Sequence, residues 1–363
     1  EMGIETVAVY SDEDADAMHV RLADYSYNIG PADASESYLN IDALMEAAER
    51  TEADAVHPGY GFLSEDADFA EMVTKAGMTW IGPWADTIRK VGDKDEARAA
   101  MIPSGIPMSK GSTPLTSVED AVEQAKDVGY PIILKPVAGG GGKGMLIANS
   151  EDDLRNILTI IDINKVKYYF EHYIEHSRHI EVQIVADNYG HVIHLGEREC
   201  SLQRRNQKLL EESPSIALTP DRRAEVGALA IKAAKSVHYN NIGTVEFLLD
   251  LKTNQFNFME INPRIQVEHG VTEAVTGIDL VRTQIRIAAG ESLDLQQEDV
   301  KFTGHAIECR INAEDPDNNF MPSPGKIDFF LEPGGPRVRV DSGVCAGLSI
   351  SPYYDSLIAK IVV

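Results

Sequence analysis

Two strand-like segments separated by a four-residue turn constrain this chain more than any other feature. Residues 243–250 and 255–260 are rich in aromatic and β-branched side chains typical of strands, with residues 251–254 as the turn. Symmetrical pairing about this turn places Glu246 directly opposite Glu260. Facing carboxylates repel each other, which favours a cation between them. Mg²⁺ suits such hard oxygen ligands and keeps positions for phosphates. Two solvated glutamates on an exposed hairpin remain the alternative.

The segment that follows alternates polar and apolar residues. If residues 260–268 are extended, every second side chain points the same way. A solvated strand face more usually carries Lys, Ser and Thr, whereas each side chain here can bind a ligand or handle a proton. The predicted row consists of Glu260, Asn262, Arg264, Gln266 and Glu268.

A run of glycines follows a predicted strand at residues 131–136. Consecutive glycines let backbone N–H groups converge on an anion and allow the rotations of a closing lid. The spacing is neither that of a P-loop nor that of a dinucleotide fingerprint, and a flexible linker is the alternative. The glycines concerned are Gly139, Gly140, Gly141, Gly142 and Gly144.

The charge balance limits the classes of partner. The chain has 33 Lys and Arg against 58 Asp and Glu, a net charge of −25, which argues against nucleic acid or an anionic membrane. Adaptation to a salty cytoplasm would also produce such a surface. The three scattered cysteines form neither a disulfide framework nor a zinc spacing. With no apolar run near the ~20 residues of a membrane span and no signal-peptide pattern, we expect a cytoplasmic protein.

A basic cluster stands out in this acidic chain. Arg198, Arg204, Arg205 and Lys208 lie close together in the sequence. They favour an anionic ligand, and salt bridges with the neighbouring glutamates at 197, 199, 211 and 212 are the alternative.

The order of elements indicates several domains. Residues 1–81 alternate short strands with helices, a pattern that predicts a parallel sheet. A helical linker is expected at 82–110, a small unit at 111–172, and a region dominated by hairpins at 173–363. The expected fold class is mixed, α/β and α+β.

Several of these features resemble biotin carboxylases, members of the ATP-grasp superfamily. The resemblance covers essentially the whole chain, and its motifs occur in the family's order. It implies a Rossmann-like N-terminal domain, an ATP-grasp lid at 111–172 and a C-terminal antiparallel-sheet domain. Compared with the family, we expect elements to be missing at both ends and a loop near 157–166 to be short. The motifs are residues 57–65, 92–94, Lys135 with the glycine run, 203–205, 264–269, 304–315 and 322–325.

The resemblance also implies roles in nucleotide and metal binding. Lys94 and Lys135 would contact phosphates, and the glycine run would cover the nucleotide as a lid. The adenine would lie between Met145 and Leu248, with Glu171 at its edge. His179 and Gln203 would face the nucleotide. The ligands for Mg²⁺ or Mn²⁺ would be Glu246, Glu260 and Asn262.

A second set of roles concerns bicarbonate and biotin. Glu268 would be the general base, and Arg339 would hold the ureido oxygen of biotin, with Tyr60 near its ring. At position 206, where bacterial members commonly carry His, this chain has Asn, which cannot titrate. Bicarbonate would be bound by Lys208, Arg264, Gln266 and the backbone of Val267.

The implied function is ATP- and Mg²⁺-dependent carboxylation of carrier-bound biotin through carboxyphosphate. The expected partners are a biotin carboxyl carrier, a carboxyltransferase and a second copy of this chain, within an acetyl-CoA or propionyl-CoA carboxylase. The alternatives are the corresponding part of a pyruvate carboxylase and another ATP-grasp ligase that forms an acyl phosphate. A catalytically silent nucleotide-binding subunit is a third, although it would be expected to have lost Glu268 or a metal carboxylate.

Overall fold

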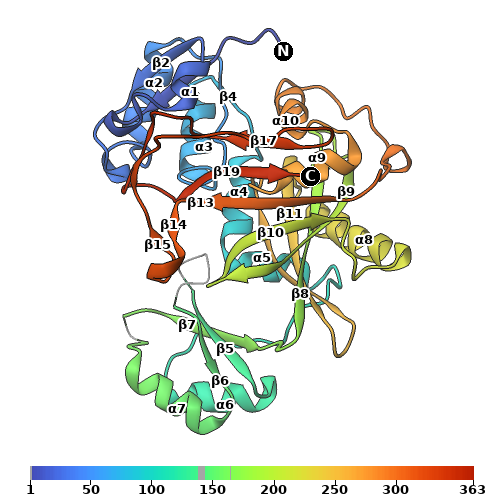
Figure 1. Ribbon diagram of the computed structural model, residues 1–363. Helices are drawn as coiled ribbons and strands as arrows, with labels where there is room; N and C mark the ends of the chain where they lie inside the picture. Colours follow the sequence, from blue (N-terminus) through green and yellow to red (C-terminus); the bar gives the residue numbers. More distant parts are fainter. Residues whose placement is uncertain (1, 138–143, 164) are drawn as a thin grey trace.

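The computed structural model describes residues 2–137, 144–163 and 165–363. Figure 1 shows an N-terminal region in blue, a small domain in green at the bottom, and a large sheet that holds most of the remaining chain. Within these residues, no helix has the length and apolar character needed to cross a lipid bilayer. The expected mixture of parallel pairs and a large antiparallel sheet is confirmed.

Helices of the N-terminal region begin where polar side chains cap their first turns. Asn40 accepts a hydrogen bond from the N–H of Ala43, and Asp66 accepts one from the N–H of Phe69. Phe69 is buried against Trp80, so the capped helix is fixed on a small apolar core. The elements are β1 (Val7–Tyr10), α1 (Met18–Leu22), β2 (Tyr25–Asn28), α2 (Ile41–Arg50), β3 (Ala55–Val56), α3 (Ala67–Lys75) and β4 (Thr79–Trp80).

The parallel pairing predicted for this region is confirmed, but the expected single sheet is not. β1 pairs with β2 and β3 pairs with β4, as two separate two-stranded sheets in the described residues. Because β3 and β4 are only two residues long, they offer few backbone groups for a third strand.

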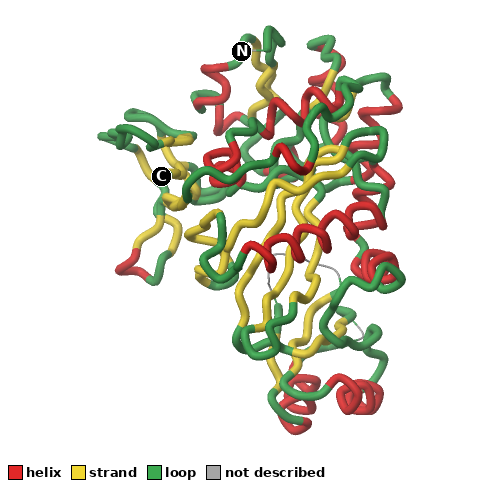
Figure 2. Tube along the Cα trace, turned by 90° about the vertical axis from the view of Figure 1, so that its right-hand side faces the viewer, coloured by secondary structure: helices red, strands yellow, loops and turns green. Residues whose placement is uncertain are grey.

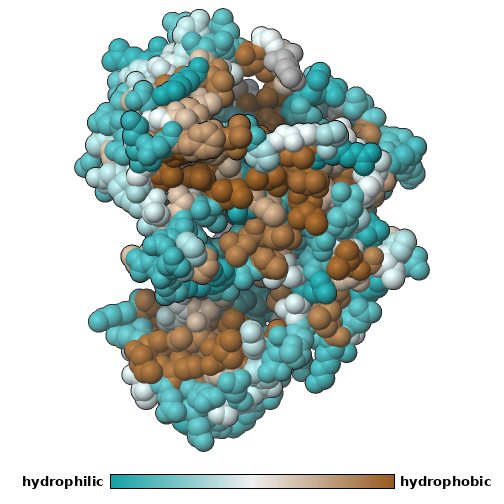
Figure 3. Space-filling model, in the orientation of Figure 1, coloured by the Kyte–Doolittle hydropathy of each residue, from teal (hydrophilic) through white to brown (hydrophobic). Residues whose placement is uncertain are grey.

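Two helices lead into the small domain, α4 (Ala85–Gly92) and α5 (Lys94–Met101). In the small domain a three-stranded antiparallel sheet, in the order β6-β5-β7, packs on two helices. Ser117 caps the first of them, where its side chain accepts a hydrogen bond from the N–H of Asp120. The surface is hollowed between this domain and the rest of the molecule (Figure 3). The elements are α6 (Val118–Val128), β5 (Ile132–Pro136), β6 (Leu146–Ala148), α7 (Glu151–Ile160) and β7 (Tyr168–His172).

An eight-stranded sheet forms the body of the protein, in the order β12-β11-β8-β9-β10-β13-β19-β17. Figure 2 shows its long strands with the helix α8 (Pro220–Ser236) lying across them. Small side chains on one face of α8, such as Ala230 and Ala233, are fully buried and allow close packing on the sheet. The strands are β8 (Ser177–Ala186), β9 (Val192–Arg204), β10 (Gln207–Ser213), β11 (Asn241–Asp250), β12 (Phe256–Asn262), β13 (Ala306–Asn312), β17 (Arg339–Ser342) and β19 (Leu357–Val362).

The remaining elements lie around this sheet. Four short strands form two further two-stranded sheets near the C-terminal end. These strands and the remaining helices are α8 (Pro220–Ser236), α9 (His269–Thr276), α10 (Leu280–Ala288), β14 (Glu314–Asp315), β15 (Met321–Pro322), β16 (Gly325–Lys326) and β18 (Ser349–Ile350).

The hairpin predicted from the sequence is confirmed, including its register. β11 pairs with β12, and Glu246 lies directly opposite Glu260. The prediction that residues 260–268 are extended is wrong beyond Asn262. The strand ends there because Pro263 has no N–H for the ladder. The chain then turns, and Glu268 becomes the residue that precedes α9.

Candidate functional site

The side chain of Lys208 is the centre of a buried charged cluster on the large sheet. Its Nζ lies 2.5 Å from Glu181 Oε2, 3.1 Å from Glu246 Oε1 and 2.7 Å from Glu268 Oε1. Burial alone would lower the pKa of Lys208, but the three carboxylates outweigh it and raise that pKa well above its usual value. Lys208 is therefore a permanent cation, available to bind an anion that enters the cluster.

Glu246 is the most extensively bonded carboxylate of the cluster. His179 Nε2 lies 2.6 Å from its Oε2, while Asn262 Nδ2 and Gln266 Nε2 donate to its Oε1 at 2.8 and 3.1 Å. Burial would raise the pKa of Glu246, but the charges of Lys208 and His179 hold it well below its usual range. The turn after β12 thus brings Gln266 back over the strand, which an extended chain would not do.

The oxygen donors around Glu246 fit a divalent cation. Glu260 faces it in register, and Asn262 adjoins it. Desolvation of its carboxyl group and the charge of Glu246 raise the pKa of Glu260, whereas the charge of Lys94 in α5 opposes this rise. His179, Glu181 and Glu246 also offer ligand atoms within 4.8 Å of one another. Two facing carboxylates beside an amide match the preference of Mg²⁺ and Mn²⁺ for oxygen.

Glu268 lies between two cations and is fully buried. Lys208 contacts one of its oxygens, and Arg310 Nη2 donates to the other at 2.9 Å. The Nε of Arg310 is in turn held by Glu211 at 2.7 Å. A carboxylate fixed in this way, next to a cation that can bind an anion, is suited to take a proton from a bound acid.

A fully buried arginine, Arg198, holds Glu181 of the cluster in place through a hydrogen bond. The side chain of Arg198 is fully buried, and its Nε donates to Glu181 Oε1 at 2.5 Å. Its other nitrogens donate to Gln183, Thr272 and Thr244 at 2.7 to 3.0 Å. Of the basic cluster noted in the sequence, Arg198 therefore has a structural role, and Lys208 remains as the group that faces the site.

Arg264 joins the cluster through Gln266. Its Nη1 donates to Gln266 Oε1 at 3.0 Å, and its Nε donates to Glu65 at 2.7 Å. The carbonyl of Val267 accepts a hydrogen bond from Lys360. The structure thus brings together the residues predicted to bind bicarbonate, although they lie on a turn instead of a strand.

The residues predicted to bind nucleotide gather in two places. In the small domain, Glu171 lies between Lys135 Nζ at 2.7 Å and Arg98 Nη1 at 3.0 Å, and Lys94 Nζ lies 5.8 Å from the centre of the Tyr169 ring. On the large sheet, Gln203 Nε2 lies 3.0 Å from His179 Nδ1, and Leu248 pairs with His179 across β11 and β8.

The predicted lid can be located only in part. Gly139, Gly140, Gly141 and Gly142 lie outside the described residues. Gly144 has a φ of 75°, a conformation that favours glycine. Met145, the next residue in the sequence, is half-buried and directly precedes β6.

Arg339, predicted to hold the biotin oxygen, is not part of the described cluster. It lies in β17 at the edge of the sheet, its side chain is 43% exposed, and it pairs with Asp341 at 2.8 Å and Glu273 at 2.5 Å. Arg310 lies two strands away in β13, roughly 10 Å at the usual strand spacing, and it is the arginine that contacts Glu268. Burial, followed by the charge of Glu308, raises the pKa of Tyr60, and Arg310 opposes this rise.

Arg310 and Glu181 were not predicted as site residues, although the sequence carries a signal for both. His179, Glu181 and Gln183 alternate along β8 and share one face of the sheet, as do Glu308 and Arg310 in β13. This is the same alternation of polar residues that marked residues 260–268.

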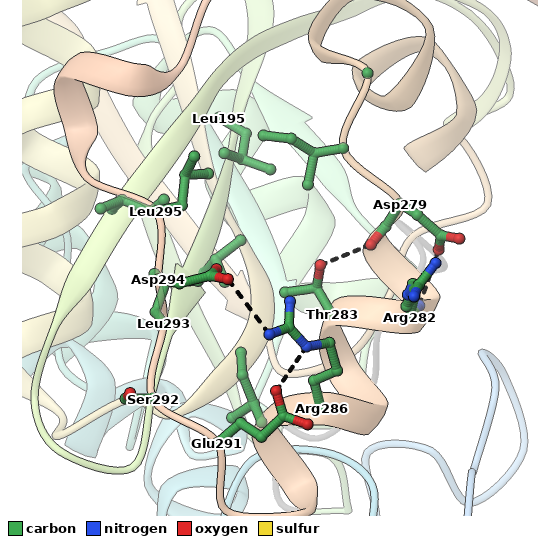
Figure 4. A pocket seen from close by; sticks show the side chains of 15 residues that line it. Leu195, Asp279, Arg282, Thr283, Arg286, Glu291, Ser292, Leu293, Asp294 and Leu295 are labelled. Carbon is green, nitrogen blue, oxygen red and sulfur yellow. Dashed lines mark hydrogen bonds and ion pairs between the residues drawn. The ribbon is translucent and has the colours of Figure 1, made fainter. Parts of the chain in front are cut away.

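A cavity of about 310 Å³ lies elsewhere, between α10 and strands β8 and β9 (Figure 4). Its floor is apolar and includes Ile193 and Leu195. At its mouth Arg286 is neutralised by Glu291 at 2.7 Å and Asp294 at 3.3 Å. Among the described residues, none of the predicted site residues lines this cavity.

Three family profiles match successive parts of the chain. They describe the N-terminal domain of biotin carboxylase at residues 1–88, the ATP-binding domain of the carbamoyl-phosphate synthase L chain at 93–296, and the C-terminal domain of biotin carboxylase at 308–363. The three matches occur in the order that the sequence motifs indicated.

Individual relatives give the same result. The chain is 54% identical over 369 residues to biotin carboxylase 1 of Bacillus subtilis, covering all of this chain and 82% of that protein. Among solved structures, the biotin carboxylase domain dimer of the Hydrogenobacter thermophilus 2-oxoglutarate carboxylase, in complex with MgADP, ADP and bicarbonate, superposes with a TM-score of 0.94 at 47% identity, covering 100% of this chain and 81% of that one. Biotin carboxylase from Campylobacter jejuni, in a β,γ-ATP complex, also has a TM-score of 0.94 at 47% identity, with 100% and 82% covered. This chain belongs to the biotin carboxylase family.

Proposed function

We propose that this chain uses ATP, Mg²⁺ and bicarbonate to carboxylate biotin attached to a carrier. The observation that carries the proposal is the arrangement of Lys208, Glu268 and Arg310. It places a general base between two cations, beside a pair of carboxylates suited to a divalent ion. The solved relative from Hydrogenobacter thermophilus, which is bound to MgADP and bicarbonate, supports the same set of ligands.

In the first half-reaction, Lys208 and Arg264 hold bicarbonate while Glu268 removes its proton. The resulting carboxylate oxygen attacks the γ-phosphorus of ATP, and carboxyphosphate and ADP form. Mg²⁺ held by Glu246, Glu260 and Asn262 would neutralise charge on the transferring phosphoryl group. Water would hydrolyse carboxyphosphate, so the intermediate must form in a site that excludes it.

In the second half-reaction, carboxyphosphate breaks down to CO₂ and phosphate. The phosphate takes the proton from the ureido nitrogen of biotin, and that nitrogen attacks CO₂. Negative charge develops on the ureido oxygen, and a fixed guanidinium stabilises it. We assign this role to Arg310 instead of Arg339, because Arg310 contacts Glu268 whereas Arg339 is paired at the edge of the sheet.

Substitution of these two arginines tests this assignment. Arg310→Ala is expected to lower carboxybiotin formation per ATP hydrolysed by ~10²-fold, the loss typical of one oxyanion-stabilising donor. Some bicarbonate-dependent ATP hydrolysis should remain, because the guanidinium acts on the ureido oxygen after carboxyphosphate forms. Arg339→Ala serves as the matched control and should leave the ratio close to that of the parent. The opposite pattern, with Arg339→Ala uncoupled and Arg310→Ala normal, would show that Arg339 holds the ureido oxygen of biotin.

A carrier and a carboxyltransferase would complete the enzyme, and a second copy of this chain is expected, since the Hydrogenobacter thermophilus relative is a dimer. We propose acetyl-CoA or propionyl-CoA as the final acceptor, with pyruvate as the alternative, and a cytoplasmic location. The carboxyltransferase selects the acceptor, so mass spectrometry of the proteins that co-purify with the native chain decides between the two. Recovery of a pyruvate-type carboxyltransferase would overturn the acyl-CoA assignment.

A further inference from the structure

Two fully buried glutamates face each other behind the active-site arginine. Glu211 of β10 and Glu308 of β13 are direct partners in the antiparallel ladder, and both side chains are completely buried. Residues opposed in this way project to the same face of the sheet, with their Cβ atoms about 4.5–5.5 Å apart. Two negative charges in this position would repel each other strongly in a medium of low dielectric constant.

The hydrogen bonds of this pair are incomplete. One oxygen of Glu211 accepts a bond from Arg310 Nε at 2.7 Å. The other oxygen of Glu211 and both oxygens of Glu308 have no hydrogen-bond partner among the described residues. A buried acceptor without a donor costs about 1–3 kcal/mol, and more if it is charged. A proton on one carboxyl would supply a donor and remove the repulsion together.

The other charged groups around Glu308 do not provide that donor. Lys360 Nζ lies 3.9 Å from it, beyond hydrogen-bond distance, and donates to the carbonyl of Val267 while it faces Asp341 at 3.6 Å. The carboxylate of Glu268 adds a further negative charge.

Packing around Glu308 is close on its other side. A Cβ atom on Gly270 of α9 would lie 3.1 Å from Glu308 Oε2 and 3.2 Å from a methyl group of Val362. Tyr60 also faces this region, and burial followed by the charge of Glu308 raises the pKa of Tyr60. These neighbours leave the carboxyl group of Glu308 little freedom to turn away, and the ladder register places it on the same face of the sheet as Glu211.

The electrostatics agree with this geometry. Burial raises the pKa of Glu308 to about 8, with Glu211 and Glu268 adding to the rise and Lys360 opposing it. Burial likewise raises the pKa of Glu211 to about 7, against the influence of Arg310. Two such groups titrate as a pair, and the pair takes up its first proton well above the usual range of a glutamate.

We propose that Glu211 and Glu308 share one proton in the working enzyme and act as a positioning pair for Arg310. The single negative charge that remains holds Arg310 by its Nε and leaves Nη2 for Glu268 and for the ureido oxygen of biotin. Loss of the proton adds a second charge next to Arg310, which draws the guanidinium towards the pair. The effect on biotin rests on the proposed function, whereas the shared proton does not.

The first test measures the proton directly. Infrared difference spectra of the intact protein, recorded between about pH 6 and about pH 9, should show a protonated carboxyl band that is lost as pH rises. Glu308→Gln should remove that band. Glu212→Gln is the matched control, because Glu212 is the next residue of β10 and pairs with His305, and it should keep the band. If the parent protein shows no titrating carboxyl band, the proposal is overturned whether or not any variant folds.

Unfolding equilibria give a second readout that is independent of activity. Because the folded pKa values lie above that of an unfolded glutamate (about 4.3), the folded protein holds a proton that the unfolded chain releases. The pair's contribution to the free energy of unfolding therefore falls as pH rises from the unfolded pKa to the folded pKa values of about 7 and about 8, and it levels off above them. Each proton changes the unfolding constant up to tenfold per pH unit. Glu308→Gln should remove this slope, and an unchanged slope would contradict the shared proton.

The third test concerns positioning. In the parent, carboxybiotin formed per ATP hydrolysed should fall roughly tenfold as the pair loses its proton, about the worth of one charged hydrogen bond. Glu308→Gln, which mimics the protonated form, should make this ratio independent of pH. Glu211→Gln should lower it at every pH because Arg310 loses its anchor. A protonated pair with a pH-independent ratio in the parent would refute the positioning role. Complete absence of carboxybiotin, with the proton present, would refute the proposed function instead.

Discussion

Glu268→Gln is expected to lower bicarbonate-dependent ATP hydrolysis by ~10²–10⁴-fold, the usual worth of a general base. Glutamine keeps the shape of the side chain but cannot accept the proton of bicarbonate. It also removes the negative charge that holds Lys208 and Arg310 on either side. Biotin-stimulated hydrolysis should fall in parallel, because both activities require carboxyphosphate. The rates are measured by release of ADP at saturating bicarbonate.

A neighbouring glutamate provides the control for this substitution. Glu273 lies one turn further along α9 and is also paired with an arginine, Arg339. Glu273→Gln should hydrolyse ATP within a few-fold of the parent rate. Equal effects of the two substitutions, or a nearly normal rate for Glu268→Gln, would mean that the base is another group.

Glu246→Gln is expected to remove most of the metal-dependent activity of the enzyme. Glu246 lies opposite Glu260 and accepts hydrogen bonds from Asn262, Gln266 and Lys208. Loss of its charge should weaken binding of Mg²⁺ or Mn²⁺ with nucleotide by on the order of 10²-fold, with a similar loss of turnover at limiting metal. Mn²⁺ binding, followed by electron paramagnetic resonance in the presence of ADP, measures the first effect without any reaction.

The fold of the Glu246→Gln protein should remain intact, because removing a charge from a crowded cluster leaves the amide able to bond Asn262 and Gln266. Glu225→Gln, which alters an exposed glutamate of α8, is the control for both readouts. Normal Mn²⁺ binding by Glu246→Gln would contradict the assignment of the metal site.

Local pattern predicted the hairpin of β11 and β12, because the two strands and their turn are contiguous and their symmetry fixes the register. The path after Asn262 was not predictable from alternation alone. Pro263 ends the strand, and the helix α9 begins at His269, seven residues after the last residue of the strand. Alternation of polar residues still identified Gln266 and Glu268, because the turn brings both side chains to the buried cluster, where Gln266 contacts Glu246 and Glu268 contacts Lys208.

The site residues that sequence reasoning missed lie on strands distant in the chain. Arg310 reaches Glu268 because β13 lies beside β10 in the sheet, an order that no local pattern reports. Arg339 and Arg310 both lie in strands near the C-terminal end, and only the strand order shows which of them reaches the base. Glu308 was hidden for the same reason, since its importance comes from facing Glu211 across the ladder.

Transfer of carbon from labelled bicarbonate to biotin tests the central claim most directly. With ATP and Mg²⁺, the protein should place label on free biotin or on a biotinylated carrier, and omission of ATP should abolish the transfer. Glu268→Gln should show almost none, while Arg339→Ala should retain it. If no label reaches biotin, while ammonia or an amine stimulates ATP hydrolysis instead, the chain forms a different acyl phosphate and the account given for Glu268 and Arg310 is contradicted.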